Sequence, residues 1–253
     1  NNNPSMARPQ MRVFAPIAFS LSLLGACAET VIAPVPAPPA PASVAGPSGA
    51  EVGRLDPRAA VQMFVDVTTS FEPVAERECR ARAPQLNCDF RIVVDDTPGM
   101  PPNAFQTLDP SGRPILVFTL AMLGEVQNAD ELAFVMSHEV SHHIAGHLAR
   151  QRQNSDLGAA VFGELAGITG QSSAEQIRVA QQLGAAVGAR SYSKEFELEA
   201  DALGTIIAHN AGYDPVKGAQ FFFRIPDPGD RFLGTHPANA ARIAVVQRVA
   251  AGL

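Results

Sequence analysis

Two histidines four residues apart, inside an apolar pattern of helical period, constrain this chain more than any other feature. They bound the run His138-Glu139-Val140-Ser141-His142. The apolar residues that recur around it at helical spacing are Leu132, Val135, Met136, Val140 and Ile144. Four residues of α-helix turn through about 400°, so both imidazoles project from one face, a turn apart. The pattern predicts a helix whose N-terminus is capped by Asn128, with Glu131 completing a capping-box-like start.

Imidazoles placed in this way can bind one zinc ion. A hydrolytic zinc site uses three protein ligands and keeps a fourth position for water, whose pKa falls to about 7. His138 and His142 are therefore candidate metal ligands, and Glu139 is the candidate catalytic base for that water. Such a pentapeptide arises by chance in on the order of one chain in a hundred, so a third ligand is needed to support this interpretation.

An acidic stretch further along the chain supplies candidates for that third ligand. Residues 193–201 read SKEFELEAD, in a helical pattern that ends near Gly212 and Pro215. Glu197 and Asp201 are four apart and share a face. We predict that Glu197 binds the metal and that Asp201, in the second shell, accepts a hydrogen bond from a ligand histidine and fixes its tautomer. The rival ligands are Glu195 and Glu199, and a solvated acidic surface is the alternative for the whole stretch.

Together the two motifs resemble the zinc metallopeptidase family that includes HtpX and the CAAX prenyl protease, in its soluble periplasmic lipoprotein branch. The similarity runs from about Pro102 to Ile243, and its smaller pieces are residues 102–105, 114–118 and 235–237, with Arg242 downstream. The resemblance implies an α+β, mainly helical, zincin-like (gluzincin) fold, with a small antiparallel-edged sheet beside the active-site helix. It also implies a metalloendopeptidase with one Zn2+ per chain.

The chain departs from that family in two ways. HtpX-like members carry transmembrane helices, and the predicted mature region has no apolar run of the required length. Residues 151–190 are unusually rich in Gly, Ala and Gln. Weak apolar stretches at 157–168 and 179–187, separated by Gly and Ser, predict a helical hairpin or a loop, which is either a lid over the cleft or a plain connection.

A small sheet is expected beside the site. Asn103 to Phe105 and Ile115 to Thr119 read as strands. An exposed edge strand can bind an extended peptide through main-chain hydrogen bonds, so Asn103, Ala104 and Phe105 are predicted to bind substrate. The alternative is a sheet with a structural role only.

A second polar group should stabilise the oxyanion that develops during peptide hydrolysis. His236 is the catalytic candidate, with Tyr192 and Arg242 behind it. Two alternatives stay open for His236. It can cap a helix that starts at Pro237 and runs to about Ala251, or it can be a fourth zinc ligand in a resting state.

The remaining histidines are interpreted as structural. In a continuous helix neither His143 nor His147 points toward the zinc ligands. His209 lies near the end of the helix that carries Glu197, where a cation is favourable.

The N-terminal region is typical of a bacterial export signal. From Met6 on, two arginines precede a short apolar run, which ends at Leu24-Gly25-Ala26-Cys27. This resembles a lipoprotein cleavage site, so we expect residues 1–26 to be a signal peptide with upstream extra residues and Cys27 to be lipidated. An ordinary secretory signal is the alternative. Ala28, in place of Asp, favours the outer membrane of a Gram-negative bacterium by the same resemblance.

The rest of the chain divides into a Pro/Ala-rich tether, residues 27–54, and a zinc metallopeptidase domain, residues 55–253. Cys79 and Cys88 are predicted to form a disulfide in the oxidising periplasm, the alternative being two free thiols. The net charge is -6 and no Lys/Arg cluster is present, which argues against a nucleic-acid partner.

The sequence therefore predicts a lipid-anchored, periplasmic, zinc-dependent endopeptidase that acts on misfolded or misassembled envelope proteins. The substrate class rests on the family resemblance alone. The alternatives are a low-turnover, zinc-containing chaperone or assembly lipoprotein of the outer membrane, and a zinc-storage or sensing protein. The natural substrate, the cleavage specificity and the oligomeric state are left open.

Overall fold

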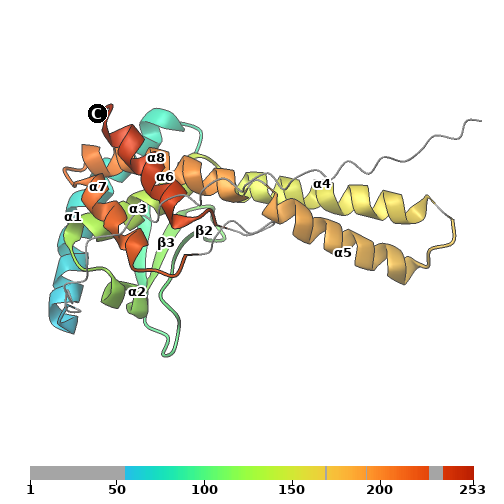
Figure 1. Cartoon of the computed structure of the whole chain (residues 1–253), viewed down its shortest axis with the longest axis horizontal. Helices are drawn as coiled ribbons and strands as arrows, with labels where there is room; N and C mark the ends of the chain where they lie inside the picture. Colours follow the sequence, from blue (N-terminus) through green and yellow to red (C-terminus); the bar gives the residue numbers. More distant parts are fainter. Residues whose placement is uncertain (1–54, 169, 192, 228–235) are drawn as a thin grey trace, which may run out of the picture. The chain divides into compact units, whose positions relative to one another are not determined.

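The computed structural model describes residues 55–168, 170–191, 193–227 and 236–253 (Figure 1). The predicted signal peptide, the lipidation site Cys27 and the tether lie outside the described residues, as does Tyr192. The elements in chain order are α1 Pro57–Arg82, β1 Arg91–Asp95, β2 Ala104–Leu108, β3 Pro114–Thr119, α2 Leu120–Glu125, α3 Ala129–Ile144, α4 His147–Gly167, α5 Ala174–Arg190, α6 Ser193–Asn210, α7 Pro215–Gly218, the 3-10 helix η1 Ala219–Phe223 and α8 Asn239–Ala250. The predicted α+β, mainly helical fold class is confirmed.

The three strands form one mixed sheet in the order β1-β3-β2. β1 runs parallel to the central strand β3, with Arg91 opposite Ile115. β2 is antiparallel to β3, with Ala104 opposite Phe118, and it forms an edge of the sheet. The strands near β2 and β3 were predicted from the sequence, and β1 was not.

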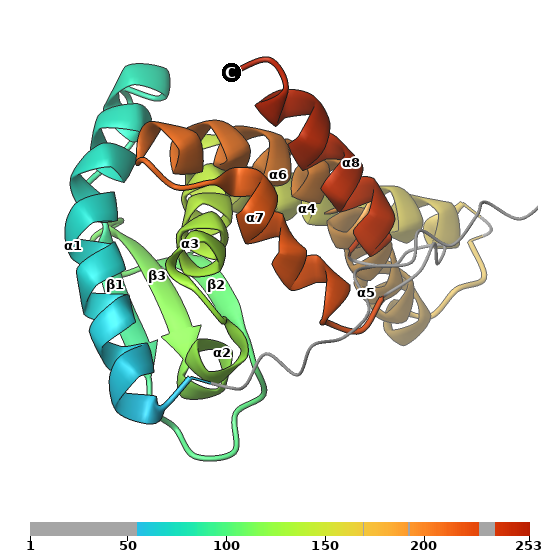
Figure 2. The ribbon, with the colours of Figure 1, turned by 60° about the vertical axis from the view of Figure 1, so that its left-hand side comes forward.

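Helices α1 and α3 pack together beside the sheet (Figure 2). α1 is amphipathic and is capped by Asp56, whose carboxylate accepts a hydrogen bond from the Arg58 N–H. Its buried face includes Phe64, whose ring meets that of Phe118 on β3 edge to face at 5.7 Å. Burial of one such aromatic side chain contributes roughly 1.5–3 kcal/mol, so this contact helps to fix α1 against the strand.

Helix α3 is buried along most of its length, which explains its apolar pattern. Asn128 caps it as predicted, since its side-chain oxygen accepts a hydrogen bond from the Glu131 N–H. The Glu131 carboxylate is itself buried. It accepts a hydrogen bond from the Gln127 N–H and forms an ion pair with Arg224, at 2.8 Å from Oε1 to Nη1. A buried carboxylate is tolerated here because it is paired and hydrogen-bonded.

Helices α4 and α5 form an antiparallel hairpin (Figures 1 and 2). Two glycines allow their backbones to touch, because a Cβ added to Gly184 would lie 2.1 Å from the Gly158 carbonyl oxygen. Ser173 and Gln176 make a full capping box at the start of α5. In the described part of the chain, no helix combines the length and the apolar character that crossing a bilayer requires.

Candidate metal centre

The two helices that carry the predicted ligands lie side by side (Figure 2). Their close approach depends on Gly204 of α6, because a Cβ there would lie only 3.1 Å from the His138 backbone nitrogen. Successive turns of α6 place Glu197 and Asp201 on the face toward α3. The i,i+4 pair of each helix therefore faces the pair of the other helix, and four side chains come together.

The structure brings His138, His142 and Glu197 together. One ligand atom from each lies within 4.8 Å of the other two. The Nε2 atoms of the two histidines are 3.0 Å apart, and each is 3.4 Å from a different oxygen of the Glu197 carboxylate. Two imidazole nitrogens and one carboxylate oxygen are a donor set that fits zinc.

The two rival carboxylates lie elsewhere. Glu195 is exposed. Glu199 contacts His147 and Arg150 instead of the two ligand histidines. Glu197 is thus the carboxylate that joins the cluster among these three.

Asp201 occupies the predicted position behind His138. Its Oδ1 accepts a hydrogen bond from His138 Nδ1 at 2.9 Å, which leaves Nε2 facing Glu197. Arg242, proposed above as an oxyanion donor, instead binds Asp201 with two hydrogen bonds of 2.7 Å. Burial alone would raise the pKa of Asp201, but the Arg242 hydrogen bonds and charge lower it, so the carboxylate stays ionised.

Glu139 borders a cavity of about 840 Å³ together with the three clustered residues. Glu139 is only 7% exposed. Residues Asn103 to Gln106, at the start of β2, also line the cavity. Leu148 and Gln151 of α4 also line the cavity, whereas no described residue of α5 does.

His236 lies beside the cluster, with its Nδ1 3.1 Å from Glu197 Oε2 and its side chain 54% exposed. Burial would raise the pKa of Glu197, but the contacts with the imidazoles of His138, His142 and His236 hold it well below its usual range. α8 begins at Asn239 with Ala238 at the N-cap position, so the helix-cap interpretation of His236 is wrong. The sequence placed the start of this helix two residues too early, because a proline can stand just outside a helix as well as at its first position.

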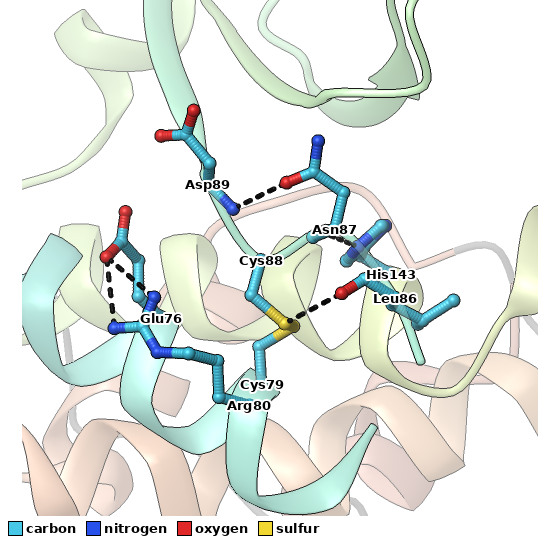
Figure 3. The surroundings of a disulfide bond; sticks show 8 residues. All are labelled: Glu76, Cys79, Arg80, Leu86, Asn87, Cys88, Asp89 and His143. Carbon is cyan, nitrogen blue, oxygen red and sulfur yellow. Dashed lines mark hydrogen bonds and ion pairs between the residues drawn. A yellow bond between two sulfur atoms is a disulfide. The ribbon is translucent and has the colours of Figure 1, made fainter. Parts of the chain in front are cut away.

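His143 has the structural role that the sequence predicted, and Figure 3 shows it beside the disulfide. Cys79 and Cys88 are joined, with their Cα atoms 5.7 Å apart. The His143 Nε2–H donates to the Asn87 carbonyl oxygen at 2.7 Å, and burial lowers the pKa of this imidazole. The disulfide and this hydrogen bond both hold residues 83–89 against the core.

His147 lies next to the cluster, a position that was not predicted from the sequence. Its Nδ1 is 2.8 Å from Nδ1 of His142, and its ring is buried. The reason is a break between α3 and α4 at Gly146, whose φ is +66°. In a continuous helix five residues turn through about 140° beyond a full turn, which would carry His147 away from His142.

Comparisons with known proteins support the same conclusion. Residues 63–250 match the model of "Peptidase family M48". The chain is 29% identical over 141 residues to the Beta-barrel assembly-enhancing protease of Escherichia coli (strain K12), covering 51% of this chain and 29% of that protein. It is 28% identical over 164 residues to mitochondrial metalloendopeptidase OMA1 of Saccharomyces cerevisiae, covering 61% of this chain and 45% of the relative.

The human mitochondrial metalloendopeptidase OMA1 is 26% identical over 188 residues, which are 68% of this chain and 34% of that protein. The match therefore spans less than half the length of each of these relatives. The family model, in contrast, covers most of this chain, including all residues of the cluster. The chain therefore belongs to peptidase family M48, which confirms the resemblance to metallopeptidases that its motifs predicted.

Proposed function

We propose that this protein is a zinc-dependent endopeptidase with one Zn2+ per chain, held by His138, His142 and Glu197. The observation that carries the proposal is the meeting of these three ligand atoms within 4.8 Å, beside Glu139 and at the wall of a cavity. Three protein ligands leave one position for water, as hydrolytic sites require.

The chain's own residues have distinct tasks in peptide hydrolysis. When bound, zinc supplies a Lewis acid that polarises the scissile carbonyl and acidifies water. Glu139 takes a proton from the attacking water and passes it to the leaving amine, so it acts first as base and then as acid. Asp201 holds the His138 ring by its Nδ1–H. His236 donates from Nδ1–H to Glu197, so it can also donate to the oxyanion, from Nε2, when its ring carries both protons.

We propose that substrate binds as an extra strand on β2. The Asn103 carbonyl accepts a hydrogen bond from the Thr119 N–H at 3.0 Å, and the Asn103 N–H donates to the Thr119 hydroxyl. Since backbone groups alternate in an antiparallel pair, those of Ala104 and Gln106 point toward the open edge. Ala104 and Gln106 are then the main-chain partners of the peptide, and Phe105 contributes its partly exposed side chain.

We also propose that the enzyme is anchored in the bacterial envelope through lipidated Cys27 and acts on misfolded or misassembled envelope proteins there. The sequence of residues 6–27 supports the anchor, and the similarity to the Beta-barrel assembly-enhancing protease of Escherichia coli supports the substrate class. The substitution Cys27→Ser tests the anchor. It should move the protein from the outer-membrane fraction to the soluble periplasmic fraction, and an unchanged membrane association would contradict the proposal.

A low-turnover zinc chaperone is the second candidate, and Glu139→Gln separates the two. In the full chain, this substitution should retain one zinc by elemental analysis while cleavage of unfolded casein falls by roughly two to four orders of magnitude. Glu195→Gln, on the exposed face of α6, is the matched control and should cleave normally. Equal cleavage by Glu139→Gln and the wild type would exclude Glu139 as the base, and zinc-loaded protein without any cleavage would favour the chaperone.

A further inference from the structure

A series of hydrogen-bonded side chains leads from His142 away from the metal centre. The Nε2 of His142 faces Glu197, so Nδ1 is its other polar atom. That Nδ1 lies 2.8 Å from Nδ1 of His147, and Nε2 of His147 lies 3.2 Å from Glu199 Oε2. Arg150 holds the same carboxylate oxygen at 2.8 Å.

The proton positions along this hydrogen-bonded series follow from the Glu199 carboxylate at its far end. The Glu199 carboxylate only accepts, so His147 donates to it from Nε2–H. A neutral His147 then has an unprotonated Nδ1, which can accept from Nδ1–H of His142. His142 in turn has an unprotonated Nε2, the form in which an imidazole binds a metal.

Packing holds His147 in the orientation that these hydrogen bonds need. Its side chain is 5% exposed, and its ring stacks on Phe196 with centroids 4.6 Å apart and planes at 11°. The Arg150 guanidinium lies 4.2 Å from the centre of the same Phe196 ring. Phe196 directly precedes Glu197, so one aromatic ring connects the start of α4 to the segment that carries the carboxylate of the cluster.

We propose that His147 is a positioning residue that fixes the tautomer and ring orientation of His142 for metal binding. The proposal rests on the proposed function, in which His142 is a zinc ligand. It makes the two ligand histidines unequal. His138 is held by the Asp201 carboxylate, whereas His142 is held by a neutral imidazole that Glu199 and Arg150 orient.

The test compares two variants of the full chain. His147→Phe keeps the ring volume and removes the acceptor, whereas His147→Asn places an amide oxygen close to the position of Nδ1. Zinc affinity is measured by competition with a chromogenic chelator, and the ligand field is read from the visible spectrum of the Co2+-loaded protein. We expect His147→Phe to lose roughly tenfold to hundredfold in zinc affinity and to shift the Co2+ spectrum, while His147→Asn stays near wild type.

The controls separate this proposal from packing and from the proposed function. His209→Phe, at an exposed position of α6, should bind zinc as the wild type does. Equal losses in His147→Phe and His147→Asn, or no loss in either, would overturn the positioning role. A wild type that binds no zinc would refute the metal site itself. If His147→Phe does not fold, nitrogen NMR of the zinc-loaded wild type decides, since the proposal requires His147 to carry its proton on Nε2.

Discussion

The Arg242 guanidinium donates two hydrogen bonds to the Asp201 carboxylate beside the candidate metal centre, from Nε to Oδ2 and from Nη2 to Oδ1, each at 2.7 Å. Asp201 is fully buried, and the Arg242 side chain is 9% exposed. The sequence assigned Arg242 to the chemistry of the reaction. The structure instead shows a residue that neutralises the carboxylate on which His138 depends.

Arg242→Met should therefore destabilise the domain by about 3–5 kcal/mol, because it leaves a buried carboxylate with His138 as its main remaining partner. Urea unfolding with excess chelator measures this without a contribution from metal binding. The matched control is Arg178→Met, which removes the exposed pair with Glu175 and should cost less than about 1 kcal/mol. Equal effects of the two substitutions would contradict the structural role assigned to Arg242.

The parts of the site that could be predicted are those set by local helix geometry. His138 with His142, and Glu197 with Asp201, are i,i+4 pairs, so each pair shares a face once its helix forms. Which helices meet is a tertiary question, and family resemblance answered it before the structure did. Gly204 then explains physically why α6 can approach α3 at His138.

Two features could not be predicted for identifiable reasons. The apolar run of β1 is short and pairs with β3, more than twenty positions later, so nothing local specifies it. His147 was misplaced because Gly146 fits inside a helical pattern as well as at a break. The positive φ that turns His147 back toward His142 is visible only in the structure.

Stability at acidic pH should depend on His143. Burial lowers the pKa of His143 below the unfolded value of 6.5, so the native state favours the neutral ring. Above pH 6.5 the ring is neutral in both states, and its contribution is fully present. Between that pH and the lowered native pKa only the unfolded state gains a proton, so stability falls as the pH is lowered, by up to about 1.4 kcal/mol per pH unit.

His143→Gln tests this, because a glutamine can still donate to the Asn87 carbonyl but does not titrate. With excess chelator, the difference in free energy of unfolding between the wild type and His143→Gln should shrink as the pH is lowered from about 7.5 to about 5. The wild type retains some pH dependence from His147, whose pKa burial lowers to about 4. The same substitution at exposed His209 should leave the pH dependence unchanged, and a constant difference for His143→Gln would contradict the prediction.

The edge of β2 can be tested with a single residue. Ala104→Pro removes the N–H that points toward the open edge, without removing a hydrogen bond to β3. We expect kcat/KM for casein to fall roughly fivefold to thirtyfold, the equivalent of about 1–2 kcal/mol for one main-chain hydrogen bond in the transition state. Ala104→Ser keeps the N–H and should cleave normally. If the proline variant unfolds at the wild-type urea concentration and cleaves equally well, substrate does not pair with this edge.

The glycines of the α4–α5 hairpin provide the last test. A valine at Gly184 would place its Cβ only 2.1 Å from the Gly158 carbonyl oxygen, so the two helices must separate. Gly184→Val should therefore lose about 1–3 kcal/mol of local stability, seen as faster amide hydrogen exchange in α4 and α5 than in α3. Gly167→Ala, where an added Cβ meets nothing within 4 Å, should keep normal protection.

The first turn of α4 reaches the cavity but no described residue of α5 does, so we expect casein cleavage by Gly184→Val to stay at the wild-type rate. A large change in that rate, with α3 still protected, would mean that the hairpin gates the cavity.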